Sequence, residues 1–184
     1  MTSADRAALH RLLLERSVKR GQFVLASGRT SSFYVDCRPT TMSAEGLVLI
    51  GRMGLAALRG RGWTARFVGG LTMGADPVAY AIAAASAANP PLVDAFSVRK
   101  EAKTHGAGRR IEGNFKPGET VVVVEDVITT GGSALQAVEA VRQERGTVLG
   151  VFAVVDREEG GLAAITSIGL EVVSLTTAKS LGLT

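Results

Sequence analysis

The stretch that decides the fold is residues 121–138, "VVVVEDVITTGGSALQAV". Four consecutive valines predict a buried strand, because β-branched side chains favour strands and a parallel strand covered on both faces has no polar side. This strand runs directly into two acids, Glu125 and Asp126, and then into a glycine-rich loop before a segment with helical periodicity. A buried strand thus delivers two carboxylates and a loop of small residues to one place.

The loop after the acids predicts a phosphate-binding site. Gly131, Gly132 and Ser133 lie between the end of a strand and the start of a helix, where free backbone N–H groups and the helix dipole attract an anion. Thr129 and Thr130 add hydroxyl donors. The Gly-Lys-Ser/Thr ending of the Walker pattern is missing. The alternative is an ordinary strand–turn–helix, which a glycine pair alone would favour.

The two acids indicate what accompanies the phosphate. Carboxylates would repel a phosphate, so Glu125 and Asp126 should serve another part of the same ligand. A carboxylate accepts hydrogen bonds, and a ribose diol offers two donors. Acids followed by this loop therefore indicate a 5′-phosphorylated ribose.

The rest of the chain predicts a single α/β domain over residues 1–184. Strands are expected at 65–70, 92–98, 120–126, 148–156 and 170–177, alternating with helices at 43–59, 76–88 and 133–145 and a short helix before the last strand. Strands that are apolar on both faces and alternate with helices predict a parallel sheet of about five strands flanked by helices. Before it, a helix capped by Ser3 and ended by Gly21 should lead into two short strands around a Ser-Gly turn in residues 22–38.

Four polar, glycine-rich segments follow the predicted strands: "GGLTMGADP" (69–77), "RKEAKTHG" (99–106), "EDVITTGGS" (125–133) and "DREEGG" (156–161). Ligands of parallel sheets bind at the carboxyl ends of the strands, so these segments should form one site. Arg157 is a planar bidentate donor suited to a carboxylate, and the alternative is a surface ion pair with Glu158 or Glu159. The basic segment 99–110 has a plainer alternative too, a solvated charged loop.

Composition narrows the function classes. The net charge of +4 fits either simple solubility or attraction of a small anionic substrate. Nucleic acid is not favoured, because aromatic residues do not interleave with the basic ones. Cys37 is the only cysteine and no histidine cluster is present, which fits a reducing compartment and no structural zinc. The charged start of the chain lacks the apolar core of a signal peptide, so a cytoplasmic location is expected.

Several of these segments resemble one enzyme family. Residues 121–134 resemble the phosphoribosyl pyrophosphate (PRPP) motif of type I phosphoribosyltransferases, a motif that leaves several nucleobases open. "RKEAKTHG" resembles the mobile catalytic loop of orotate phosphoribosyltransferases, "SGRTSSFYVDCR" (27–38) resembles their N-terminal orotate hood, and "VVDREEGG" (154–161) resembles the segment with their orotate-binding arginine. The likeness covers nearly the whole chain in the same order.

The resemblance implies a type I phosphoribosyltransferase-like parallel sheet flanked by helices, with a small hood over about residues 1–40. It implies transfer of ribose 5-phosphate from PRPP to orotate, which yields orotidine 5′-monophosphate and pyrophosphate in pyrimidine synthesis. It also implies a homodimer with shared active sites. Mg²⁺ is expected mostly on pyrophosphate, ribose oxygens and water, with no dedicated protein ligands.

Residue roles follow from the same resemblance. Lys103, His105 and Asp126 would be catalytic, and orotate would be bound by Thr129 and Arg157. PRPP would be bound by Arg99, Lys100, Lys103, His105, Glu125, Asp126, Val127, Ile128, Thr129, Thr130, Gly131, Gly132 and Ser133.

Two positions depart from some bacterial members, since Ala26 and Met73 stand where those carry lysines; Arg109 and Arg110 have no assigned role.

Two other functions stay open. A purine or uracil phosphoribosyltransferase would not need Arg157 for a carboxylate. A PRPP-sensing regulator would need a nucleic-acid-binding module, for which the chain has no spare residues.

Overall fold

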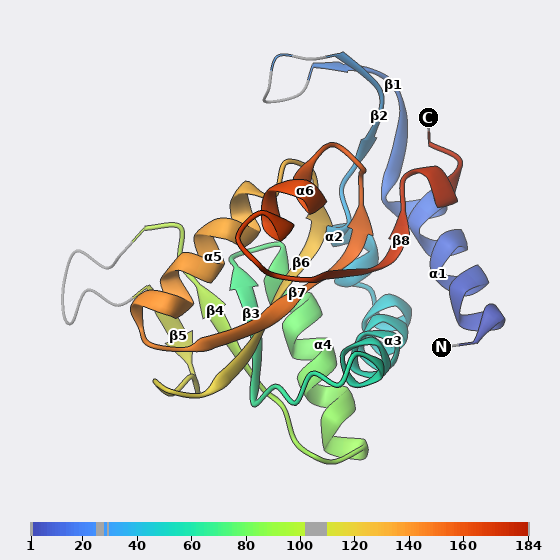
Figure 1. Ribbon diagram of the computed structural model, residues 1–184. Helices are drawn as coiled ribbons and strands as arrows, with labels where there is room; N and C mark the ends of the chain where they lie inside the picture. The colour runs from blue at the N-terminus through green and yellow to red at the C-terminus, as the bar shows by residue number, and fades with distance from the viewer. Residues whose placement is uncertain (1, 25–27, 29, 102–109, 184) are drawn as a thin grey trace.

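A six-stranded sheet forms the centre of the computed structural model, which describes residues 2–24, 28, 30–101 and 110–183. The strand order is β5-β4-β3-β6-β7-β8, and every neighbouring pair is parallel except β4 with β5 (Figure 1). The strands are β3 (Phe67–Leu71), β4 (Asp94–Val98), β5 (Ile111–Gly113), β6 (Thr120–Ile128), β7 (Thr147–Asp156) and β8 (Val172–Thr177). The predicted parallel sheet is confirmed.

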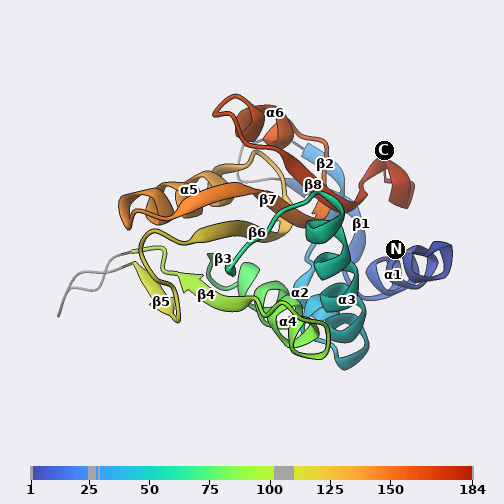
Figure 2. The same cartoon turned by 60° about the horizontal axis from the view of Figure 1, so that its bottom comes forward.

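Helices cover both faces of this sheet (Figure 2). Helices α3 (Ala44–Gly60) and α4 (Ala75–Ala88) pack on one face, and α5 (Gly132–Gln143) and α6 (Gly161–Thr166) on the other. The valines of β6 explain the arrangement, because successive side chains of a strand point to opposite faces. Val122 and Val124 belong to the core under α3 and α4, whereas Val121 and Val123 belong to the core under α5.

The strand β5 was missed within the polar segment that follows β4. It is three residues long and pairs antiparallel with β4, with Val98 opposite Ile111. So short a strand has no periodicity of its own to detect.

The N-terminal segment begins differently from the prediction. Thr2, not Ser3, caps α1 (Ser3–Arg16): its hydroxyl accepts the Asp5 N–H at 3.1 Å, and the Asp5 carboxylate accepts the Thr2 N–H at 3.2 Å. The helix ends before Ser17, and Gly21 lies within the next strand. As predicted, two antiparallel strands follow, β1 (Val18–Val24) and β2 (Thr30–Val35).

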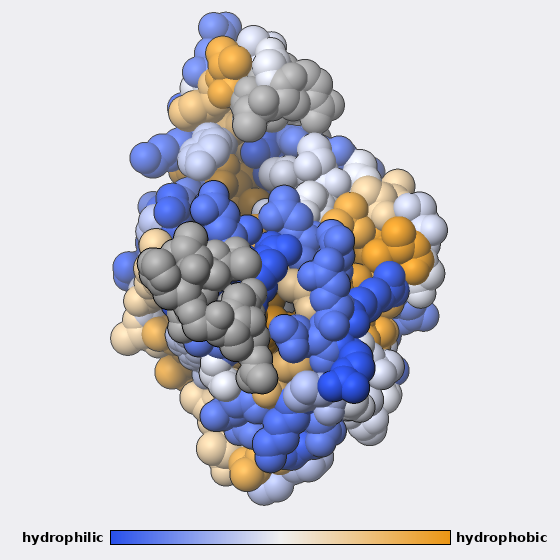
Figure 3. Space-filling model, turned by 90° about the vertical axis from the view of Figure 1, so that its left-hand side faces the viewer, coloured by the Kyte–Doolittle hydropathy of each residue, from blue (hydrophilic) through white to orange (hydrophobic). Residues whose placement is uncertain are grey.

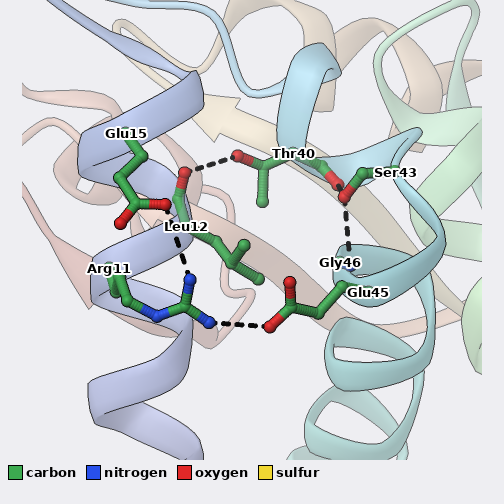
Figure 4. Close-up of polar contacts among 7 residues, drawn as sticks. All are labelled: Arg11, Leu12, Glu15, Thr40, Ser43, Glu45 and Gly46. Carbon is green, nitrogen blue, oxygen red and sulfur yellow. Dashed lines mark hydrogen bonds and ion pairs between the residues drawn. The ribbon is translucent and has the colours of Figure 1, made fainter.

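Polar contacts tie α1 to the helices that follow the hairpin (Figure 4). The Arg11 guanidinium lies 2.7 Å from Glu45 at the start of α3. The Thr40 hydroxyl, in the short helix α2 (Arg38–Thr41), donates to the Leu12 carbonyl at 3.2 Å. Ser43 caps α3 as predicted by accepting the Gly46 N–H at 3.1 Å. These contacts anchor both ends of the β1–β2 hairpin to the main body.

The chain ends in a 3₁₀ turn, η1 (Lys179–Leu181), which follows β8. None of the helices in the described residues is long and apolar enough to cross a bilayer.

Candidate active site at the carboxyl edge of the sheet

The carboxyl ends of the parallel strands meet at one edge of the sheet, and the β1–β2 hairpin lies beyond that same edge (Figure 1). Figure 3 shows the molecule from the left-hand side of Figure 1, and the middle of that face is mainly hydrophilic. The four polar segments expected to converge all follow strands of this sheet: β3, β4, β6 and β7. Segment 99–106 lies partly outside the described residues.

A polar hollow of about 230 Å³ follows strand β6. Gly131 adopts φ 84° between the strand and α5, a left-handed conformation that glycine reaches without strain, and α5 begins at Gly132. The first-turn N–H groups of α5 have no partner within the helix and therefore suit an anion. The hollow is lined by Glu125, Val127, Ile128, Thr129, Thr130, Gly131, Gly132, Ser133, Ala134 and Gln136.

The start of α6 packs directly against this loop. The Gly161 N–H donates to the Thr129 carbonyl at 2.9 Å, and the Arg157 N–H donates to the Ile128 carbonyl at 2.9 Å. A Cβ atom on Gly161 would stand 2.6 Å from the Thr129 oxygen, so only glycine fits. These bonds join the segment that follows β7 to the loop that follows β6.

Glu125 and Asp126 have different surroundings. The Glu125 side chain is 5% exposed, and its Oε1 is buried with no hydrogen-bond partner among the described residues. Burial, followed by the charge of Asp126, raises the pKa of Glu125 to about 8. Asp126 is half-buried; burial raises its pKa, while the Val127 N–H, which donates to Oδ1 at 2.8 Å, acts against the shift. The pKa of both acids is raised, and that of Glu125 lies above neutral pH, so Glu125 can be neutral near pH 7.

The loop between β3 and α4 lies beside Asp126. A Cβ on Gly74 would be 2.5 Å from Asp126 Oδ1. The Thr72 hydroxyl donates to Asp76 Oδ2 at 2.6 Å, which closes the loop onto the first turn of α4. Met73 between them is 58% exposed and carries no charge. Backbone and small side chains thus border the acids on this side.

Arg157 is buried rather than exposed. Its side chain is 3% exposed, its Nη2 lies 2.6 Å from Glu159 Oε1, and its guanidinium carbon lies 4.9 Å from the ring centre of Phe33. The predicted alternative of a surface ion pair is therefore wrong about exposure, although the pairing with Glu159 does form. Phe33 belongs to β2, so the hairpin supplies the aromatic ring that packs on this arginine.

Asp36 and Arg38, at the end of the hairpin, were missed as neighbours of the acids. Arg38 donates from Nε and Nη2 to the two carboxylate oxygens of Asp36 at 2.8 and 2.9 Å. Both charges reach Asp126, whose pKa is raised by Asp36 and lowered by Arg38. Between them Cys37 is fully buried, and burial raises its thiol pKa well above the usual range.

The remaining predicted residues are placed only in part. Arg99 follows β4, and its Nε donates to Glu112 Oε1 at 2.9 Å. The Lys100 carbonyl accepts from Arg110 Nη2 at 3.3 Å. The calls on Ala26, Lys103, His105 and Arg109 lie outside the described residues. The structure therefore brings residues 125–133 and Arg157 together, and sets Arg99 and Lys100 after a strand of the same sheet.

A glycine-rich loop preceded by two acids at this edge is the arrangement expected of a phosphoribosyltransferase, and residues 49–168 match the family described as phosphoribosyl transferase domain. Among curated proteins, the orotate phosphoribosyltransferase of Rhodopirellula baltica is 43% identical over 97% of this chain and 95% of its own. That of Aquifex aeolicus is 47% identical over 95% and 96%. The chain belongs to the orotate phosphoribosyltransferase family.

The fold agrees with a solved structure of the same family. The Mycobacterium tuberculosis H37Rv orotate phosphoribosyltransferase in complex with PRPP is similar with a TM-score of 0.81 and 40% identity, over 99% of this chain and 94% of that one.

Proposed function

We propose that the protein transfers the ribose 5-phosphate group of PRPP to orotate, forming orotidine 5′-monophosphate and pyrophosphate in pyrimidine nucleotide synthesis. In this reaction the bond between the anomeric carbon and the pyrophosphate oxygen breaks. A bond from that carbon to orotate N1 forms, and N1 loses its proton. The observation that carries the proposal is the hydrogen bond from the N–H of buried Arg157 to Ile128, the last residue of β6 before the proposed phosphate loop. A carboxylate-binding cation thereby stands next to a seat for a 5′-phosphate.

Different residues around the hollow bind different parts of PRPP. The loop 129–133 binds the 5′-phosphate through backbone N–H groups and hydroxyls. Asp126 and Glu125 accept hydrogen bonds from the ribose hydroxyls, for which the unpartnered Glu125 Oε1 is suited. Positive charge develops at the anomeric carbon as pyrophosphate leaves, as in glycosyl transfer generally. An ionised Asp126 stabilises that charge from a fixed position.

Pyrophosphate departs toward cationic residues in the same proposal. Arg99 and Lys100 follow β4 and are exposed. Lys103 and His105 remain predicted catalytic residues. Mg²⁺, when bound with PRPP, neutralises part of the pyrophosphate charge. The carboxylate of Asp126, proposed to bind the ribose, has the chemistry that suits such an ion. No cluster of three or more acids, histidines and cysteines that could hold a metal ion occurs in the described residues.

Burial of Arg157 distinguishes the competing bases. Arg157 is 3% exposed and already pairs with Glu159, and the 6-carboxylate of orotate offers this buried cation a second anionic partner, whereas uracil, adenine and hypoxanthine offer none. Orotate is therefore favoured over the other nucleobases.

A homodimer with shared sites, acting as a single-domain cytoplasmic enzyme, is part of the proposal. Val48 on α3 and Tyr80 on α4 are 73% and 53% exposed, and both line an apolar groove between the two helices. Tyr80 also hydrogen-bonds Ser97, two residues before Arg99, at 3.0 Å. A second copy seated on this groove would lie beside the base of segment 99–106, which supports the predicted donation of that segment to a neighbouring site.

The direct test incubates PRPP and Mg²⁺ with orotate, uracil, adenine and hypoxanthine in parallel and follows pyrophosphate release. Orotate alone should support rapid release. Rapid release with another base and none with orotate would overturn the assignment.

A further inference from the structure

Glu159 forms an ion pair with Arg157, the cation that the proposed substrate needs. Its Oε1 lies 2.6 Å from Arg157 Nη2, and its side chain is only 18% exposed. The same Nη2 faces the Ser31 hydroxyl at 3.5 Å. Arg157 Nε is buried and has no hydrogen-bond partner among the described residues. The guanidinium is thus engaged at one nitrogen and unsatisfied at another.

The backbone holds Glu159 in this position. Glu158 before it has φ 59° and Gly160 after it has φ 96°, so two left-handed residues flank Glu159. A positive φ is uncommon at a residue other than glycine. The Glu158 side chain turns away from Arg157, and its Oε2 accepts the Lys179 N–H at 2.8 Å. Among the described residues the two adjacent acids therefore contact different groups, and Glu159 is the one that pairs with the buried arginine.

The negative charge of Glu159 beside Arg157 stabilises the substrate-free protein and opposes binding of a substrate carboxylate. A buried guanidinium without an anion nearby is strongly destabilising, so Glu159 stabilises the substrate-free protein. When a substrate carboxylate approaches the same guanidinium, two negative charges face one positive charge in a poorly solvated pocket. The substrate must then weaken or replace the contact with Glu159.

We propose that Glu159 is a competing counter-ion, which holds Arg157 in the substrate-free site and yields it to the carboxylate of the pyrimidine substrate. This inference rests on the proposed function. A pyrimidine without a carboxylate leaves the Arg157–Glu159 pair intact and gains nothing from the cation. Arg157 then discriminates orotate from uracil, and competition from the Glu159 carboxylate lowers the affinity for orotate.

The test compares Glu159→Gln with Glu158→Gln, a matched change at the adjacent acid that keeps an acceptor for the Lys179 N–H. Glu159→Gln should lower the KM for orotate by about fivefold or more, which corresponds to about 1 kcal/mol, because the substrate carboxylate no longer competes with an anion for Arg157. The KM for PRPP should stay nearly constant. Without substrate, Glu159→Gln should melt at a lower temperature than wild type, and orotate should raise its melting temperature by more. Glu158→Gln should show none of these changes.

A higher orotate KM in Glu159→Gln would mean that Glu159 orients Arg157 for the substrate, and an unchanged KM would mean that the contact does not compete; either overturns the inference. If Glu159→Gln fails to fold, Glu159→Asp provides the same test, because its shorter side chain weakens the contact and should lower the orotate KM by a smaller factor. Absence of orotate turnover in wild type and Glu158→Gln alike would instead overturn the proposed function.

Discussion

Gly74 and Asp126 touch at the edge of the sheet, although they come from different loops. A Cβ at position 74 would lie 2.5 Å from Asp126 Oδ1 and 2.9 Å from its Cγ, closer than such atoms approach in folded proteins. The loop after β3 therefore limits where the carboxylate at the end of β6 can stand. Position 74 controls the acid without bearing any chemistry of its own.

Gly74→Ala should consequently impair catalysis more than folding. The methyl group displaces the end of a side chain rather than backbone, so the melting temperature should fall little, whereas the misplaced Asp126 should lower kcat/KM for PRPP by roughly tenfold, about 1.4 kcal/mol. Gly60→Ala is the control, since a Cβ there meets no atom within 4 Å. Steady-state kinetics with unchanged kcat/KM for PRPP in Gly74→Ala would show that Asp126 tolerates displacement.

Asp126→Asn should reduce turnover by at least about tenfold with little effect on orotate binding. The amide keeps the shape of the side chain but loses the charge that stabilises the cationic transition state. Asp94→Asn, at the start of β4 and paired with Arg66, serves as the control for loss of one negative charge. Near wild-type turnover in Asp126→Asn would assign the acid to a structural role.

Phe33→Leu should weaken orotate binding through Arg157. The ring lies 4.9 Å from the guanidinium carbon, and cation–π contacts contribute about 0.5–2 kcal/mol, so the orotate KM should rise roughly 2- to 30-fold. Arg157→Ala should raise it further. Phe23→Leu is a matched change in the same hairpin, where Phe23 packs on Tyr34 instead. Equal effects of Phe23→Leu and Phe33→Leu would attribute the loss to the hairpin and not to the arginine.

Glu125 should make the ligand-free protein less stable as pH rises. Below about pH 4.5 its carboxyl group is protonated whether the chain is folded or not; between 4.5 and about 8 only the unfolded chain loses the proton. The free energy of unfolding should therefore fall across this window, by up to a few kcal/mol on the order of the shift, and level off above it.

Glu125→Gln removes this dependence. The difference in unfolding free energy between wild type and Glu125→Gln, measured by denaturant titration from pH 5 to pH 9, should move against wild type as pH rises. Glu139→Gln, on the exposed face of α5, provides the reference slope. A constant difference between wild type and Glu125→Gln would show that Glu125 is ionised in the folded protein near pH 7.

Mixing two inactive variants should restore activity if sites are shared between subunits. Lys103→Ala damages the segment predicted to be donated, and Asp126→Asn damages the receiving pocket. A mixed dimer would hold one site with both defects and one with neither, so activity should return toward half of the wild-type value per mixed dimer. No recovery after independently demonstrated subunit exchange would show that each chain completes its own site.

The sequence predicted those features that depend on local pattern. The four valines of β6 predicted a strand buried on both faces, and Ser43 predicted the start of α3, because strand burial and capping depend on neighbouring residues. The cap of α1 was misplaced by one residue because Thr2 and Ser3 are both good caps. Only the reciprocal contact of Thr2 with Asp5 distinguishes them.

Features that depend on tertiary contact were not predictable in the same way. Nothing in "DREEGG" distinguishes a surface arginine from a buried one, since Phe33, which packs on the buried Arg157 guanidinium, lies more than a hundred residues earlier. Nor does the spacing of Asp36 and Arg38 show that their charges reach Asp126. The roles of Glu125, Asp126 and Arg157 in binding remain predictions that the variants above can test.

Two backbone hydrogen bonds fix the distance between the end of β6 with its loop and the segment after β7. The Arg157 N–H donates to Ile128 and the Gly161 N–H donates to Thr129, so the main chain itself sets the spacing between the proposed phosphate loop and Arg157. A side-chain substitution leaves this spacing unchanged. Substitutions that change the base preference of the enzyme should therefore lie in the hairpin and at Glu159, while these two backbone hydrogen bonds stay the same.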